Sequence, residues 1–172
     1  MNRLYYKLLL VCSIILLLGC QNSDYDLENI VPQMYHKILS LKQSGEIQLE
    51  LSGTETECKK ELFVWKGGSQ MELEAKASLR LFTESELADY NALNATDYKL
   101  LKKENYSLSN SIFEFSSKDN FKKSELVLYP QRISEDMAST HEKYILPLRL
   151  VSEQDSVLAT KNSIIFIIDI LQ

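Results

Sequence analysis

Short stretches of alternating apolar and polar residues recur along this chain. Residues 46–51 alternate over six positions and residues 71–82 over twelve, which is the period of a β-strand with one buried face. Five more runs are dense in β-branched and aromatic residues: 61–65, 111–115, 125–129, 144–151 and 163–171. About seven strands at this spacing predict an all-β fold, an antiparallel β-sandwich.

Two of these runs carry further information about their place in a sheet. Residues 163–171 are apolar at nearly every position, which predicts a strand inside a sheet with both faces covered. A transmembrane interpretation fails on length and on Asp169. Pro147 interrupts the preceding run and predicts an edge strand or a bulge there.

Two interruptions of the strand pattern look helical. Thr83 is followed three residues later by Glu86, the form of a capping box that opens a short crossover helix over residues 87–93. Residues 133–137 predict a second, weaker helical turn.

The first residues have the pattern of an export signal. Arg3 and Lys7 precede a short apolar run at residues 8–18, which is too short to span a bilayer. The following Gly19-Cys20 resembles a bacterial lipobox, which implies cleavage before Cys20 and a diacylglyceryl group and palmitate-type acyl chains on this cysteine. The alternative is an ordinary secretory signal. We predict a signal peptide at 1–19, a lipidated acidic tether at 20–32 and a β-sandwich domain at 33–172.

The tether also contains a short segment that resembles a localisation signal. Residues 23–26 are Ser-Asp-Tyr-Asp and resemble the acidic signal that sends lipoproteins of Bacteroides-type bacteria to the outer face of the outer membrane. This predicts a lipid-anchored protein on the cell surface, with a periplasm-facing anchor as the alternative.

Charge and cysteine content exclude several classes of function. Removing residues 1–19 takes two of the 19 basic residues and none of the 24 acidic ones, so 17 minus 24 leaves about −7. This balance argues against a nucleic-acid partner. Cys58 is then the last free thiol, so neither a disulfide framework nor a cysteine-rich metal site is expected, and we interpret Cys58 as a half-buried residue at a strand end.

Candidate catalytic chemistry is sparse. His36 and His141 lie far apart and outside any recognisable catalytic or metal-binding motif. The carboxylate pairs Glu84/Glu86 and Glu135/Asp136 have a spacing that glycoside hydrolysis could use, but such pairs arise by chance among 24 acids. We predict no catalytic residue, no cofactor and no metal, and hence no enzyme.

Aromatic side chains are the better candidates for ligand contact. Trp65 and Phe63 alternate along one strand and share a face, for which burial is the first expectation and a sugar-stacking platform the second. Tyr90, Tyr98 and Tyr106 are expected in loops that contact a ligand or a neighbouring domain.

A modification site is also suggested by a short motif. Residues 155–157 are Asp-Ser-Val, which resembles the O-glycosylation site of exported proteins in these bacteria. The alternative is a polar turn between the last two strands. We predict a glycan on Ser156.

Four segments together resemble one bacterial lipoprotein module, domain of unknown function 1735: residues 66–68, 87–101, 106–108 and 144–150. Residues 102–104 depart from its usual Leu-Pro. The resemblance implies an immunoglobulin-like β-sandwich and a role beside glycan capture in glycan-utilisation systems. Members usually continue into a carbohydrate-binding or glycosidase domain, which residues 33–172 do not include.

Two functional hypotheses remain. The first is a surface-anchored, non-enzymatic lipoprotein module for binding or docking in glycan capture, with the membrane, a glycan or a partner glycan-utilisation protein as its contacts. The second is a structural, adhesin-like or fimbrial-like assembly protein whose last strand pairs with a partner's sheet edge.

Overall fold

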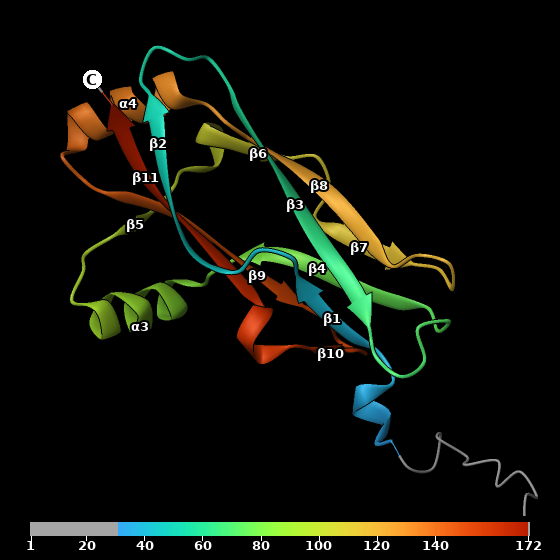
Figure 1. Ribbon diagram of the computed structural model, residues 1–172. Helices are drawn as coiled ribbons and strands as arrows, with labels where there is room; N and C mark the ends of the chain where they lie inside the picture. The colour runs from blue at the N-terminus through green and yellow to red at the C-terminus, as the bar shows by residue number, and fades with distance from the viewer. Residues whose placement is uncertain (1–30, 172) are drawn as a thin grey trace, which may run out of the picture. The chain divides into compact units, whose positions relative to one another are not determined.

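The computed structural model describes residues 31–171, which form two packed β-sheets (Figure 1). Sheet A contains, in spatial order, β10 (Ser156–Val157), β1 (Ile38–Leu41), β3 (Cys58–Gly67), β8 (Phe121–Leu128) and β6 (Tyr106–Leu108). Sheet B contains β2 (Gly45–Ser52), β11 (Ser163–Leu171), β9 (Tyr144–Val151), β4 (Ala75–Leu81) and β7 (Ile112–Phe115). β5 (Lys99–Leu100) pairs with the start of β9.

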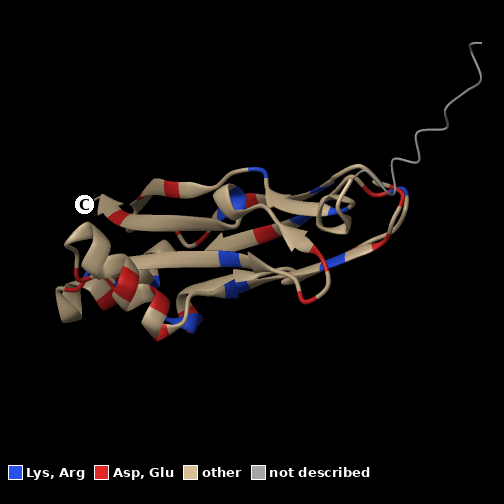
Figure 2. Cartoon of the chain, turned by 90° about the horizontal axis from the view of Figure 1, so that it is seen from below, with Lys and Arg blue, Asp and Glu red and all other residues tan. Residues whose placement is uncertain are grey.

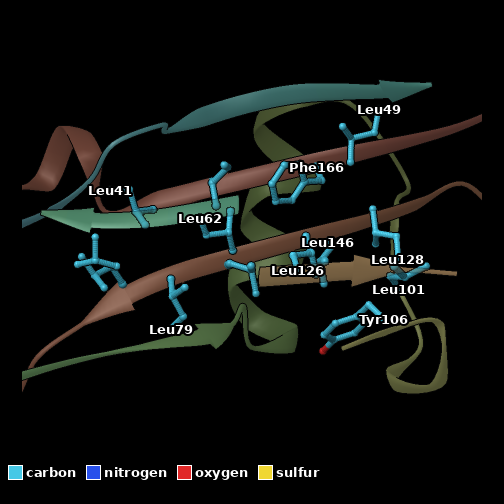
Figure 3. Close-up of a cluster of buried hydrophobic side chains, with 14 of the residues drawn as sticks. Leu41, Leu49, Leu62, Leu79, Leu101, Tyr106, Leu126, Leu128, Leu146 and Phe166 are labelled. Atoms are coloured by element: carbon cyan, nitrogen blue, oxygen red, sulfur yellow. The ribbon is translucent and has the colours of Figure 1, made fainter. Parts of the chain in front are cut away.

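The core lies between the two sheets, where alternate side chains of each strand face inward. Leu62 of β3 and Leu126 of β8 extend from sheet A, and Leu146 of β9 and Phe166 of β11 from sheet B (Figure 3). All four are buried. The alternation that predicts the strands therefore also sets which residues form the core.

Within residues 31–171, two helices and two 3₁₀ turns connect the strands, and a third 3₁₀ turn precedes β1. α3 (Glu84–Asn94) begins with the predicted capping box: Thr83 Oγ accepts from Glu86 N at 3.2 Å, and Glu86 Oε2 accepts from Thr83 N at 2.8 Å. α4 (Pro130–Thr140) is longer than its predicted turn and begins with proline at N1. The 3₁₀ turns are η1 (Gln33–Tyr35), η2 (Lys103–Asn105) and η3 (Ala159–Lys161).

The all-β sandwich predicted from sequence is confirmed, with more strands and a more mixed pairing than expected. The additional strands are the short β1, β5, β6 and β10. Three pairs are parallel: β2 with β11, β1 with β10, and β5 with β9. β4 begins at Ala75, because residues 71–74 form the turn that precedes it.

The interior position predicted for the last strand is also confirmed. β11 pairs with β2 on one side and β9 on the other, and residues 164–168 are buried. The hypothesis that this strand pairs with a partner's sheet edge is therefore wrong for this fold, because β2 pairs with one backbone edge over residues 164–171 and β9 pairs with the other over residues 163–167.

Pro147 does not mark an edge strand or a bulge: β9 lies between β11 and β4. A residue's N and C=O point to the same side of a strand, and Pro147 O accepts from Phe82 N at 3.1 Å. The missing N–H therefore lies on the side of β9 where two strands pair in succession. β5 pairs with residues 144–145 and β4 with residues 148–151, and Pro147 falls between the two. A central proline is tolerated because no neighbouring strand needs its N–H.

The described residues contain no helix that is long and apolar enough to cross a membrane.

Replacing a core leucine should cost much more stability than replacing an exposed one. Leu146 is fully buried, whereas Leu93 on α3 is 85 % exposed. We expect Leu146→Ala to lower the free energy of unfolding by about 2–5 kcal/mol and Leu93→Ala by less than about 0.5 kcal/mol, measured by urea denaturation. Equal losses in the two variants would contradict the assigned core.

Candidate functional site

Three aromatic rings form a patch on the outward face of sheet A. Trp65 on β3 lies opposite Phe121 on β8 in register, and their ring centroids are 6.1 Å apart. Phe63 lies two residues before Trp65, with its ring centroid 6.0 Å from that of Phe121. Trp65 is 45 % and Phe121 52 % exposed. We call Phe63, Trp65 and Phe121 the aromatic patch.

Charged and polar groups border the aromatic patch. The Lys42 ammonium lies 5.0 Å from the Phe63 ring centroid, within cation–π range. Lys123 lies opposite Phe63 in register, and its Nζ is 2.9 Å from Glu61 Oε1. Flat aromatic carbon surrounded by hydrogen-bonding groups suits a ligand ring that has an apolar face and polar edges, which is the chemistry of a pyranose.

The first expectation for Trp65, burial, is wrong. Leu62, Val64 and Lys66 take the inward positions of β3, so Phe63 and Trp65 face outward. Lys66 is only 1 % exposed, and its Nζ donates to Leu73 O at 2.9 Å and to Ser116 O at 2.7 Å. A lysine at an inward position is the signal that sequence reasoning missed: its ammonium is tolerated because backbone carbonyls accept its hydrogen bonds.

Tyr106 does not lie in an open loop. It begins β6 and is buried in the main core, and burial raises the pKa of its hydroxyl. The Lys103 ammonium lies 4.6 Å from its ring centroid. Tyr106 is therefore a core residue of sheet A and not an exposed ligand contact.

Tyr90 and Tyr98 form a separate contact beneath α3. Their ring centroids are 6.4 Å apart, and both pack against a small apolar cluster on the outward face of sheet B: Phe82, Ile145, Ile165 and Ile167. The Tyr90 hydroxyl donates to Glu46 Oε1 at 2.8 Å. Burial is the largest cause that raises the pKa of this hydroxyl, and the hydrogen bond to Glu46 is the second. Tyr90 thus lies on a helix, and the pair fastens α3 to sheet B.

One residue of each carboxylate pair has a structural role. Glu86 accepts from Arg80 Nη1 at 2.6 Å, contacts Arg149 and caps α3. The Arg80 hydrogen bond is the largest cause that lowers the Glu86 pKa to about 2. Asp136 accepts from Lys102 Nζ at 2.7 Å and from Asn105 Nδ2 at 2.6 Å, which lower its pKa. Neither carboxyl group is suited to donate a proton near neutral pH.

The remaining candidates do not gather into a site. His36 follows η1, and His141 ends α4 in the left-handed conformation, with φ of 59°. Cys58 is a half-buried residue at the start of β3. Among residues 31–171, no group of three or more His, Cys, Asp or Glu side chains could hold a metal ion. In the view of Figure 2, basic residues are interspersed with acidic ones.

Of the two predicted modification sites, Ser156 lies within the described residues and Cys20 lies outside them. Ser156 lies on β10, the edge strand of sheet A, and is partly exposed. The preceding Asp155 carboxylate is fixed by Lys37 Nζ at 2.5 Å and by Lys76 N at 2.8 Å. Gly19 and Cys20 lie outside the described residues. Glycosylation of Ser156 and lipidation of Cys20 both stay predictions.

A family model described as "-like, N-terminal domain" matches residues 30–157. A crystal structure of a multidomain protein including DUF1735, from Bacteroides ovatus, is similar to this chain with a TM-score of 0.55 at 12 % identity, over 77 % of this chain and 44 % of that one. The chain belongs to the DUF1735 family. The family resemblance seen in the sequence is thereby confirmed.

Other structures share the fold of this DUF1735 domain. A candidate carbohydrate-binding protein from Bacteroides ovatus has a TM-score of 0.61 at 20 % identity, covering 76 % of this chain and 36 % of its own. The Bacteroides protein EndoBT-3987, solved with a Man5GlcNAc product, has a TM-score of 0.53 at 15 % identity, covering 73 % and 28 %. The DUF1735 chain thus spans less than half of each of these proteins. No curated protein matches it.

The contact between Glu86 and its two arginines should make stability depend on pH. The folded pKa of Glu86, about 2, lies below its ordinary value of 4.5, so its contribution is complete above about pH 4.5 and is lost as pH falls toward 2. We expect Glu86→Gln to lower the free energy of unfolding by about 1–2 kcal/mol at pH 7, since the arginines are partly exposed. The difference from wild type should narrow below pH 4.5 in urea titrations.

Glu84→Gln is the matched control, because Glu84 lies in the same first turn of α3 and is exposed. A pH-independent loss in Glu86→Gln, or an equal loss in Glu84→Gln, would show that the arginine contacts do not stabilise the charged form.

Proposed function

We propose that this DUF1735 domain is a lipid-anchored, non-enzymatic module of glycan capture that contacts glycan through its aromatic patch. The exposure of Trp65 and Phe121 carries this proposal. Large aromatic side chains are usually buried. Adjacent half-exposed aromatic rings on an otherwise charged sheet face therefore favour a ligand-contact surface. A partner protein of a glycan-utilisation system is the other contact that such a patch would suit.

The size of the patch indicates weak binding at each site. A sugar that covers roughly 100–150 Å² of the two exposed rings would gain about 3 kcal/mol at about 25 cal/mol per Å². This is less than the roughly 4 kcal/mol of a millimolar complex. The bordering lysines and glutamates would add hydrogen bonds, so useful affinity is expected for a polysaccharide that meets many copies of the domain.

The neighbours of the fold support a glycan-related role. One is a candidate carbohydrate-binding protein and another was solved with a glycan product, although this chain covers only part of each. We infer a non-enzymatic role because Glu86 and Asp136 are engaged in structural contacts. Anchoring at the outer membrane, facing the cell surface or alternatively the periplasm, is supported by the sequence around Cys20.

The geometry of the domain also suits a spacer. η1 and the start of β1 lie at one end of the sandwich, and the end of β11 lies at the other (Figure 1). The nine residues of β11 alone extend roughly 30 Å. A domain anchored through Cys20 would therefore hold its far end away from the membrane.

Glycan binding should depend on Trp65. In affinity gels that contain soluble polysaccharides, we expect the wild-type protein to be retarded by at least one glycan and Trp65→Ala to lose at least several-fold of this retardation, because the largest exposed ring is removed. Ile112→Ala is the control, since Ile112 is 51 % exposed but lies on sheet B. Equal retardation of Trp65→Ala and wild type would contradict the assignment.

Intact-mass spectrometry of the protein from its native host tests the two predicted modifications. We expect a chain that begins at Cys20 and carries the mass of two or three acyl chains, and a further glycan mass that disappears in Ser156→Ala. A chain without acyl mass would refute the anchor, and a lipidated polypeptide without further mass would refute the glycan.

A further inference from the structure

Four exposed apolar side chains gather at the end of the sandwich where the described chain begins. Met34 and Tyr35 belong to η1, and Met71 and Leu73 belong to the turn before β4. Each is between 37 and 58 % exposed. We call these four residues the apolar tip.

Backbone hydrogen bonds hold the two parts of the apolar tip together. Ser69 N donates to Tyr35 O at 3.1 Å, and Gln70 N donates to His36 O at 3.0 Å. Gly68 permits this approach, because its φ is +118° and a Cβ there would lie 2.3 Å from His36 O. Met34 and Leu73 line the same hollow of about 500 Å³. The apolar tip is therefore one built surface and not two independent loops.

The buried Lys66 fixes the second part of this surface. Its ammonium donates to Leu73 O, so the backbone at Leu73 is held while its side chain stays exposed. Exposed Met, Leu and Tyr side chains held in this way on a small surface indicate a partner.

The partner is constrained by the length of chain that precedes the tip. Eleven residues separate Cys20 from Pro32, a distance of at most roughly 40 Å when fully extended. Pro32 is directly followed by η1. A lipid on Cys20 would keep the apolar tip within this distance of the bilayer at all times and make the lipid surface its most abundant neighbour.

We propose that the apolar tip inserts into the interfacial region of the bilayer that holds the lipid on Cys20. This inference rests on the lipid anchor of the proposed function. Tyr suits the interface because its ring is apolar and its hydroxyl polar, and Met and Leu suit the acyl boundary below. Glu72 and Glu74 in the same turn limit the depth to a shallow contact, so the tip orients the domain while the lipid retains it.

Site-specific fluorescence on vesicles tests this contact. The protein for this experiment begins at residue 21 and carries an N-terminal histidine tag in place of the lipidated cysteine. It also carries Cys58→Ser, so that the dye reacts with one introduced cysteine. It is held on vesicles of phosphatidylethanolamine, phosphatidylglycerol and a nickel-chelating lipid. An environment-sensitive dye is attached at Met71→Cys or, as control, at Leu93→Cys on α3. We expect the dye at 71 to brighten at least about threefold and shift to the blue, with little change at 93.

Two further results separate the possible failures. Changing Met34, Tyr35 and Leu73 to Ser together should abolish the response at 71 while the protein still sediments with the vesicles. An unchanged dye signal at 71 on vesicles that carry the protein would overturn the tip contact. The tag replaces the natural lipid, so the dye result does not depend on whether Cys20 is acylated. The absence of acyl mass from the native protein would overturn the lipid anchor and not the tip contact.

Discussion

The inward position of Lys66 on β3 is the constraint on which both proposed surfaces depend. Side chains alternate along a strand, so placing Leu62, Val64 and Lys66 inward forces Phe63 and Trp65 outward. A shift of one residue would bury the tryptophan and expose two core residues. The cost of burying an ammonium group is offset by the carbonyls of Leu73 and Ser116.

These two side-chain hydrogen bonds, and one from its backbone N–H, connect Lys66 to the neighbouring segments. Ser116 begins the turn that leads to β8, and Lys66 N donates to Asn120 O at 2.9 Å, directly before Phe121. Leu73 belongs to the apolar tip. The buried Lys66 side chain thus holds the start of the turn that leads to the second ring of the aromatic patch and the turn that presents the tip, while its backbone N–H holds the end of the first turn.

The regular parts of the fold follow from the sequence because they depend on local pattern. The period of two predicts the long strands, and the Thr83–Glu86 capping box predicts the start of α3. The short strands β1, β5, β6 and β10 were missed because two to four residues are too few for a period to show. Pro147 was misplaced because its tolerance depends on how β5 and β4 share one side of β9, a relation that no local pattern contains.

The candidate site was only partly predictable for a related reason. Trp65 was a candidate because tryptophan is large and aromatic, but its exposure depends on the phase of β3. No local sequence pattern indicates Phe121, since its importance comes from its register opposite Trp65. Tyr106 is not a ligand contact because it lies on β6 and is buried in the core. The sequence does not indicate this, since the short β6 shows no strand period.

The two outward faces of the sandwich differ in a way that fits the proposals. α3 covers part of sheet B through Tyr90 and Tyr98, whereas the aromatic patch on sheet A stays open beside charged pairs such as Lys123 and Glu61. A single sugar stacked on this patch would be bound weakly, so the orientation of the domain would matter more than the strength of one contact. A domain whose tip rests on the bilayer would present the patch in a similar direction in every copy, and a polysaccharide could then bridge several copies with little further loss of rotational freedom.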